Sequence, residues 1–223
     1  MILAIDTTGF KCGTALWDNG RITLLETEEK LRHNEVIFAQ IQQLLQDQNS
    51  SLADVEAVAV SSGPGSFTGL RVGMAVAKSL CWSLEIPFIA VPTLEGLANC
   101  APADIYSVIS IMPARADEVY WSHFAYENNR WEDQTLERLN TLEEMQDELA
   151  VEALFIGEGY AKHQNHLEQI FGDLIMNNRV DYKPRPLVEA TIILAASRFN
   201  ENSFDDLMES EPRYCYQFPR RQA

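Results

Sequence analysis

A glycine-rich run between an apolar strand and an apolar helix constrains this chain more than any other segment. Residues 62–73 read SGPGSFTGLRVG, between the strand-like residues 57–60 and the helix-like residues 70–84. Glycines let the backbone take positive φ and let a ligand or another chain approach closely, while a helix N-terminus favours an anion. The run lacks the Lys-Ser/Thr pair of a P-loop and the spacing of GxGxxG. The residue types favour a tight strand-to-helix turn and leave a phosphate site as the alternative.

The balance of charge excludes unaided nucleic-acid binding. The 223 residues include 33 acids and 17 bases, which gives a net charge of −16, and both halves of the chain are acidic. Proteins that bind nucleic acid draw most of their affinity from Lys and Arg contacts to phosphate. We therefore expect this chain to need a partner protein for any contact with nucleic acid.

The N-terminus and the cysteines favour a cytoplasmic protein. Met1 is followed at once by a short apolar strand, without the basic region and cleavage site of a signal peptide, and no segment has the length of a membrane span. Cys12, Cys81, Cys100 and Cys215 lack CxxC spacing. We expect reduced cysteines that serve packing, and no contact with a membrane.

The first half of the chain predicts a sheet that begins with three antiparallel strands. Asn19-Gly20 lies between two apolar segments and is a strong hairpin signal. The helix after the glycine-rich run is flanked by two strands, which predicts a right-handed β-α-β crossover. Strands are expected at 1–6, 12–17, 21–27, 57–61 and 86–91, and helices at 33–48 and 70–84.

The second half repeats this pattern more loosely. Strands are expected at 106–111, 118–125, near 131 and at 153–156, and helices at 142–149 and 191–199. Two successive units of antiparallel strands, helix and strand predict a duplicated α/β architecture. We expect an N-terminal lobe of residues 1–104 and a C-terminal lobe of residues 105–223, with the option that the C-terminal tail packs back on the first lobe.

The helix after the glycine-rich run must pack against other elements on more than one side. Within residues 70–84 only Arg71 and Lys78 are charged, and a helix that is apolar nearly all round must be buried. Gly69, Gly73 and Ala77 recur at four-residue spacing and would allow another helix to approach closely. The neighbouring helix of the same chain or a helix of another chain could cover this seam, and the sequence alone does not choose between them.

Several motifs resemble those of the bacterial TsaB (YeaZ) family. They are GPGSFTGLR in the glycine-rich run, the opening MILAIDTT, IPFIAVPTLEGLA and ARADEVYW, in the family's order over residues 1–125, with weaker similarity in IGEGY and EPRY. The resemblance implies two lobes of the ASKHA (actin-like ATPase, RNase H-like) fold, with mixed sheets flanked by helices and the second lobe reduced.

The same resemblance implies a role in tRNA modification. TsaB proteins belong to the bacterial machinery that makes N6-threonylcarbamoyladenosine at position 37 of tRNAs reading ANN codons. It implies a non-catalytic scaffold that forms a heterodimer with TsaD, which transfers the threonylcarbamoyl group, with the ATPase TsaE as third member. A homodimer is a further expectation, and tRNA would be reached only through the complex. No cofactor is implied, although a nucleotide could remain at a complex interface.

The resemblance also assigns the helices at 34–48 and 70–84 to an interface. In TsaB relatives these two helices pair with the equivalent two of TsaD, or of a second TsaB, as a four-helix bundle. The implied interface residues are Val36, Ile37, Gln40, Gln43, Gly69, Val72, Gly73, Val76, Ala77 and Leu80.

A vestigial phosphate site is the second expectation that the ASKHA resemblance carries. Asp6 ends the first strand and is followed by Thr7 and Thr8, where ASKHA folds place an acid near a metal and hydroxyls near phosphate. An Asx-turn that ends the strand is the favoured alternative. The candidates for the vestigial loop are Asp6, Thr7, Thr8, Gly63, Gly65 and Ser66.

Departures from the enzyme pattern argue against catalysis by this chain. A second phosphate loop of the DxG type is expected near residues 111–117, where the sequence reads IMPARAD and Pro113 replaces the family's usual Asp before Ala and Arg115. Thr93 and Leu97 stand where TsaD carries two metal-binding histidines, and neither can replace an imidazole on a metal. An ATP-dependent phosphotransferase of the sugar-kinase type is the alternative, and it would need the second loop.

No other segment predicts a catalytic or metal centre. His163 and His166 are three residues apart and form at most half of a metal site, without an obvious third ligand at helical spacing. No GxSxG elbow is present. We therefore expect neither a catalytic residue nor a bound metal.

Overall fold

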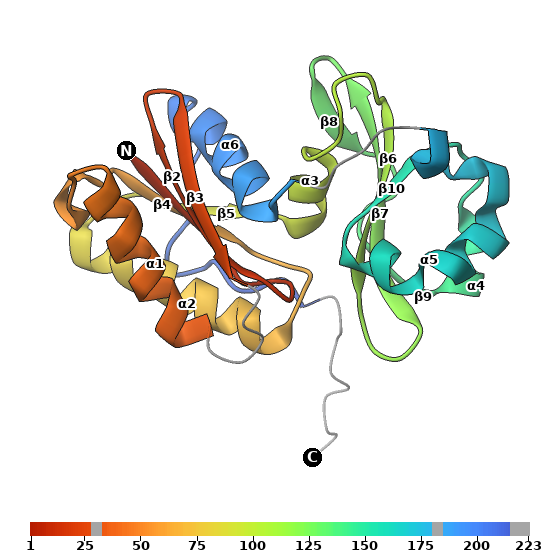
Figure 1. Ribbon diagram of the computed structural model, residues 1–223, viewed down its shortest axis with the longest axis horizontal. Coiled ribbons are helices and arrows are strands. Elements are labelled where there is room, and N and C mark those ends of the chain that lie inside the picture. Colours follow the sequence, from red (N-terminus) through yellow and green to blue (C-terminus); the bar gives the residue numbers. More distant parts are fainter. Residues whose placement is uncertain (28–32, 180–184, 215–223) are drawn as a thin grey trace.

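The computed structural model describes residues 1–27, 33–179 and 185–214, and folds them into two lobes that are each built on one mixed sheet (Figure 1). The predicted α/β fold of two sheets flanked by helices is confirmed. Cys12, Cys81 and Cys100 are buried free thiols, whereas Cys215 lies outside the described residues. No helix in the described part of the chain is both long and apolar enough to cross a membrane.

The first sheet has the strand order β3-β2-β1-β4-β5, with β1, β2 and β3 antiparallel and β4 and β5 parallel to β1. Asn19 (φ 47°) and Gly20 (φ 88°) form the turn between β2 and β3, so the predicted hairpin is confirmed. The strands are β1 (Ile2–Asp6), β2 (Cys12–Asp18), β3 (Arg21–Thr27), β4 (Ala57–Ser61) and β5 (Phe88–Val91).

Helices cover both faces of this sheet, which is why β1 and β4 are buried along their whole length. The helices α1 (His33–Asp47) and α2 (Phe67–Leu84) lie side by side on one face, and α6 (Leu187–Asn200) packs on the other (Figure 1). The short 3-10 helix η1 (Leu52–Asp54) connects α1 to β4.

The second sheet has the order β10-β6-β7-β8, and β9 also pairs with β7. Its strands are β6 (Ser107–Pro113), β7 (Glu118–Glu127), β8 (Arg130–Asp133), β9 (Arg138–Thr141) and β10 (Leu154–Ile156). One face packs against the helices α4 (Leu142–Glu148) and α5 (Glu158–Phe171). The 3-10 helices η2 (Gly172–Leu174) and η3 (Met176–Arg179) complete the described part of this lobe.

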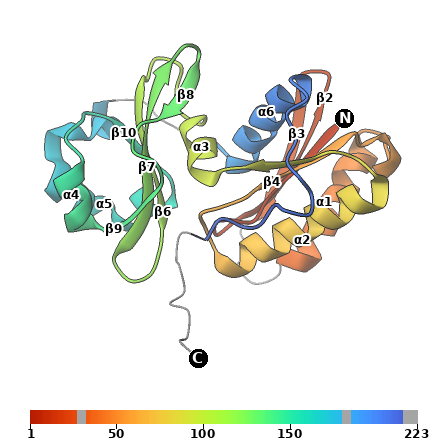
Figure 2. The same ribbon diagram turned by 180° about the vertical axis from the view of Figure 1, so that it is seen from behind.

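The helix α3 (Thr93–Ala98) lies between the two lobes, where it contacts β6 and β7 of the second sheet and α6 of the first lobe (Figure 2). Because α6 packs on β1 and Phe88 of β5 pairs with Asp205, residues 187–214 belong to the first lobe. The expected second lobe of residues 105–223 is therefore too long. The structure takes the option in which the C-terminal tail packs back on the first lobe.

Candidate functional site

The glycine-rich loop makes its close approaches to its own chain. Gly63 has φ 115°, and a Cβ built on it would lie 2.6 Å from the carbonyl oxygen of Arg213. A Cβ on Gly65 would lie 2.6 Å from the carbonyl oxygen of Thr8. The amide of Gly63 donates a hydrogen bond to the hydroxyl of Thr93, at 3.1 Å. The loop is thus a tight strand-to-helix turn whose glycines pack against its own chain, which is the favoured reading of its residue types.

The small-residue seam of α2 is covered by the end of β1. A Cβ on Gly69 would lie 1.9 Å from the carbonyl oxygen of Thr7, and one on Gly73 would lie 2.4 Å from its hydroxyl. Ala77 is also buried within the chain. The prediction that Gly69, Gly73 and Ala77 present a free seam to a partner helix is therefore wrong. Four-residue spacing identified the side of close contact, but the contact is the chain's own strand.

Two further predicted interface residues also face inward. Ile37 is fully buried in the core between α1 and the sheet. The buried amide of Gln40 donates to the carbonyl of Cys12 at 3.3 Å and accepts from the hydroxyl of Thr14 at 3.3 Å. The residues that remain at least partly accessible are Val36, Gln43, Val72, Val76 and Leu80.

These accessible residues belong to an outer surface that carries no carboxylate. We call it the α1/α2 face: the exposed and half-buried side chains of residues 36–46 and 67–84 (Figure 1). Only Arg71 and Lys78 are charged in these two segments. At its edges Phe38 is 55% exposed and Trp82 is 68% exposed. Exposed aromatic residues on a face with few charges are typical of protein–protein contact surfaces.

The end of β1 forms the Asx-turn that the sequence favoured. The Oδ1 atom of Asp6 accepts hydrogen bonds from the amide of Thr8 at 3.1 Å and from its hydroxyl at 2.7 Å. The hydroxyl of Thr7 donates to the carbonyl of Gly69 at 2.7 Å. Burial raises the pKa of the Asp6 carboxyl, and these hydrogen bonds oppose the rise. Both threonine hydroxyls thus have partners inside the chain.

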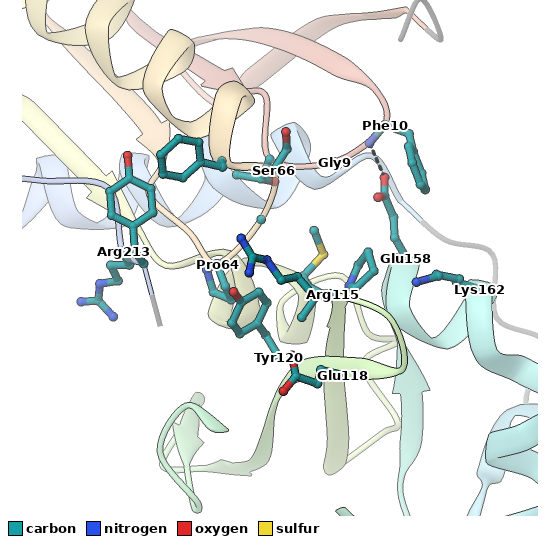
Figure 3. A pocket seen from close by; sticks show the side chains of 17 residues that line it. Gly9, Phe10, Pro64, Ser66, Arg115, Glu118, Tyr120, Glu158, Lys162 and Arg213 are labelled. Carbon is teal, nitrogen blue, oxygen red and sulfur yellow. Dashed lines mark hydrogen bonds between the residues drawn. The ribbon is translucent and has the colours of Figure 1, made fainter. Parts of the chain in front are cut away.

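A cavity of about 740 Å³ lies between the two lobes (Figure 3). The first lobe contributes Thr8, the β1–β2 loop and residues Gly65 and Ser66 of the glycine-rich loop. The second lobe contributes the β6–β7 turn, from which Arg115 points toward the glycine-rich loop (Figure 3). Lys162 of α5 and Arg213 also line this cavity. The carboxylates of Glu118 and Glu158 line it too, so its cations exceed its acids by one.

Glu158 divides the cleft between the lobes in two. Its Oε1 atom accepts a hydrogen bond from the amide of Phe10 at 2.8 Å, drawn as a dashed line in Figure 3. Gly9, Met112 and Glu158 line both the larger cavity and a second one of about 400 Å³ that includes Asp6. The vestigial-loop candidates are therefore separated, and Thr7 and Gly63 line neither cavity. The sequence analysis missed Glu158, although its position between two glycines after a strand was the available signal.

The positions that carry metal or phosphate chemistry in the enzyme pattern serve packing in this chain. Thr93 is buried and accepts the hydrogen bond from the loop, and Leu97 packs in the apolar cluster of α3 and β6. Pro113 ends β6 at the place expected for the second phosphate loop. Over residues 1–27, 33–179 and 185–214, no three or more His, Cys, Asp or Glu side chains gather as a metal site. His166 lies 3.4 Å from a carboxylate oxygen of Glu143.

Comparisons with known proteins agree on one family. A family model described as TsaD, tRNA N6-adenosine threonylcarbamoyltransferase, matches residues 27–222. The tRNA threonylcarbamoyladenosine biosynthesis protein TsaB of Escherichia coli (strain K12) is 30% identical over 219 residues, covering 96% of this chain and 93% of the relative. The protein of the same name from Bacillus subtilis (strain 168) is 33% identical over 191 residues, covering 83% of each.

Two solved structures share the fold. A crystal structure of an uncharacterized protein with similarity to peptidase YEAZ from Pseudomonas aeruginosa superposes with a TM-score of 0.78 at 23% identity, covering 96% of this chain and 99% of the other. A structure of YeaZ from Pseudomonas aeruginosa superposes with a TM-score of 0.75 at 24% identity, covering 96% and 98%. The two-lobed ASKHA-like fold expected from the sequence is thus confirmed.

Proposed function

The chain belongs to the TsaB family of tRNA threonylcarbamoyladenosine biosynthesis proteins, and we propose that its role there is that of a non-catalytic subunit that binds and activates TsaD. In this role TsaD transfers the threonylcarbamoyl group to adenosine 37 of tRNA. The chain described here contributes a binding surface and no reacting group.

The α1/α2 face is the observation that carries this proposal. A chain with a net charge of −16 has charged side chains over most of its surface, yet residues 36–46 and 67–84 contain no acid. The accessible Val72, Val76 and Leu80 give this face an apolar centre. A helical layer that faced only water would gain solubility from charged residues. We assign the α1/α2 face to contact with the equivalent helices of TsaD, and in the absence of TsaD to a homodimer.

The packing of the glycine-rich loop supports a non-catalytic role. Gly63 and Gly65 approach Arg213 and Thr8 of the same chain so closely that no ligand atom fits between them. Leu97, at a position where the resemblance places a histidine of TsaD, is packed among apolar side chains. A binding role requires neither a phosphate loop nor a metal. TsaE would act as third member of the complex, and tRNA would bind through the assembled complex in the cytoplasm.

Inserting a charge into the α1/α2 face tests the proposal. Ala75 is exposed on α2, so Ala75→Glu should leave folding intact and weaken association with TsaD about tenfold, because a partner would strip water from the new carboxylate, a loss that pairing with Arg71 and Lys78 offsets only in part. Formation of N6-threonylcarbamoyladenosine in a reconstituted reaction should fall in parallel. The matched control is Ala161→Glu, which places the same charge on the exposed side of α5 in the second lobe.

Co-elution of the Ala75→Glu variant with TsaD at wild-type affinity would remove the α1/α2 face from the interface. A loss of modification activity without a loss of association would place the contribution of this chain elsewhere than in binding.

The cavity between the lobes favours a nucleotide-dependent alternative. The chain would then bind a residual nucleotide, or act as an ATP-dependent phosphotransferase. Arg115, Lys162 and Arg213 line a volume of about 740 Å³, large enough for a nucleotide. Calorimetric titration of the isolated chain with MgATP tests nucleotide binding, and phosphate release tests turnover. A scaffold should release no phosphate from ATP, whereas turnover that Asp6→Ala abolishes would establish the enzymatic alternative.

A further inference from the structure

The chain after α6 returns along α2 as a segment without regular helix or strand, with a turn at residues 206–210, which we call the strap (residues 203–214). The strap begins on the first sheet, where the amide of Asp205 donates to the carbonyl of Phe88 at 3.0 Å. Farther along, the ammonium group of Lys78 in α2 donates to the carbonyl of Ser210 at 2.8 Å. Figure 2 shows the strap in blue beside α2. It runs antiparallel to the helix and ends at the helix's first turn.

The end of the strap is fixed to the start of α2 by an aromatic and cationic cluster. The amide of Arg213 donates to the carbonyl of Ser62 at 2.7 Å. The rings of Tyr214 and Phe67 lie 5.1 Å apart, and the guanidinium carbon of Arg71 lies 3.9 Å from the centre of the Phe67 ring. The Nε atom of Arg71 also donates to the hydroxyl of Tyr214 at 3.0 Å. Tyr214 thus makes a tilted ring contact with Phe67 and a hydrogen bond with Arg71, whose guanidinium carbon lies 5.8 Å from the centre of the Tyr214 ring.

The first two turns of α2 are held on their inner side by the buried side chains of Leu70 and Met74. Two of their positions, Gly69 and Gly73, have no side chain because they approach β1 too closely. The capping hydrogen bond is the one from the amide of Gly69 to the hydroxyl of Ser66, at 3.2 Å. Phe67 and Arg71 stand four residues apart on the outer side of the helix, where Tyr214 covers both. The strap therefore adds packing on the outer side of these turns, through Phe67 and Arg71.

We propose that Tyr214 is a positioning residue: through Phe67 and Arg71 it fixes the first two turns of α2 and thereby sets the partner-facing surface that these turns begin. The second half of this inference rests on the proposed function. The first half concerns the isolated chain and stands independently of any partner. The strap acts here as a built-in clamp on the helix that contacts the partner.

Hydrogen exchange on the full chain tests the first half. Tyr214→Ala removes the ring and the hydroxyl, so the amides of residues 70–75 should exchange about 3- to 30-fold faster, as expected for the loss of an aromatic pair and a hydrogen bond. Tyr214→Phe keeps the ring, and its increase should be about threefold or less. The matched control is Tyr126→Ala, which removes a tyrosine whose ring makes an edge contact with Trp131 in the second lobe, at 5.2 Å between ring centres, and should leave α2 unchanged.

Association with TsaD, measured on the same four proteins, tests the second half. Tyr214→Ala should weaken binding about 3- to 30-fold, and Tyr214→Phe should restore most of it. Unchanged exchange in α2 of Tyr214→Ala would overturn the clamp. Faster exchange with wild-type affinity would overturn the link to the partner surface. If wild-type chain does not bind TsaD at all, the proposed function fails, while the exchange rates still decide whether Tyr214 fixes α2.

Discussion

Two helical layers of this molecule have the same structural role but differ in the charge of their outer surfaces. Both α1 with α2 and α4 with α5 cover one face of a mixed sheet and supply its core. The second layer exposes acids such as Glu143, Glu144 and Asp147 on α4, whereas residues 36–46 and 67–84 of the first layer contain none. The contrast is what the proposed assignment of the first layer to a protein contact would require.

The lobes also share one packing device, in which a glycine at a helix start touches the end of a central strand. A Cβ on Gly69 of α2 would lie 1.9 Å from the carbonyl oxygen of Thr7, after β1. A Cβ on Gly159 of α5 would lie 2.5 Å from a methyl group of Ile111 in β6, and 3.0 Å from its backbone. The first-lobe contact is closer, and its nearest atom belongs to the backbone, which can move less than a side chain.

The largest effect that the comparison predicts is therefore loss of stability from Gly69→Ala. Overpacking of this kind costs about 1–3 kcal/mol, which lowers the melting temperature of a chain of this size by roughly 2–12 °C. Gly159→Ala should cost less, because a methyl group can shift more easily than a strand end. Thermal unfolding followed by circular dichroism measures both.

The control for that comparison is Ala75→Leu, which enlarges an exposed position of the same helix and should leave the melting temperature unchanged. A folded Gly69→Ala protein with wild-type stability would show that the contact between α2 and Thr7 is loose. The seam would then be available to a partner after all.

The two central strands also differ in their last residue, because β1 ends in the buried acid Asp6 and β6 ends in Pro113. Because burial raises the pKa of Asp6, its charged form is disfavoured in the folded chain at neutral pH. Asp6→Asn keeps an oxygen that can accept from Thr8 and removes the charge. It should raise the melting temperature at pH 7 by about 2–4 °C, the shift that about 1 kcal/mol gives in a chain of this size.

The sign of the pH dependence follows from linkage. A carboxyl with a raised folded-state pKa binds its proton more tightly in the folded chain, so stability falls as pH rises from 3.8 through the raised value. The advantage of Asp6→Asn should thus be full at pH 7 and shrink toward pH 4. An equal advantage at both pH values, or a lower melting temperature at pH 7, would show that Asp6 is not destabilised by its burial.

The smallest signal is expected for tRNA binding by the isolated chain. Neither helical layer offers a positive field, and the net charge is −16. We expect no saturable tRNA binding at micromolar protein concentration in about 150 mM salt. A micromolar dissociation constant would lie at the tight end of the range for non-specific binders. A filter-binding titration checks this, with the TsaD complex as positive control. Micromolar binding by the chain alone would mean that the cations around the interlobe cavity act together.

The sequence predicted the elements with strong local signals. Asn19-Gly20 specified a hairpin, and the strand-loop-helix pattern around residues 57–84 specified the β-α-β unit. The sequence also predicted close packing of Gly69 and Gly73 but not its partner, because helical spacing defines a face of the helix and not what covers it. That face meets Thr7.

The elements that sequence reasoning missed are short or irregular. The strand β9 and the helix α3 have 4 and 6 residues, too few for a periodic pattern. The helix α5 is interrupted at His163, where φ is −112° and ψ is 17°. The strap is irregular and held by side-chain contacts to distant residues, such as those of Tyr214, which no local pattern encodes.

Hydrogen exchange of the chain with and without TsaD from the same organism tests the central claim most directly. The account predicts slower exchange on binding in residues 36–47 and 67–84, with the acidic helices at 142–148 and 158–171 unchanged. A complex that forms while the α1/α2 face exchanges at its free rate, and the α4/α5 layer becomes protected, would contradict the account.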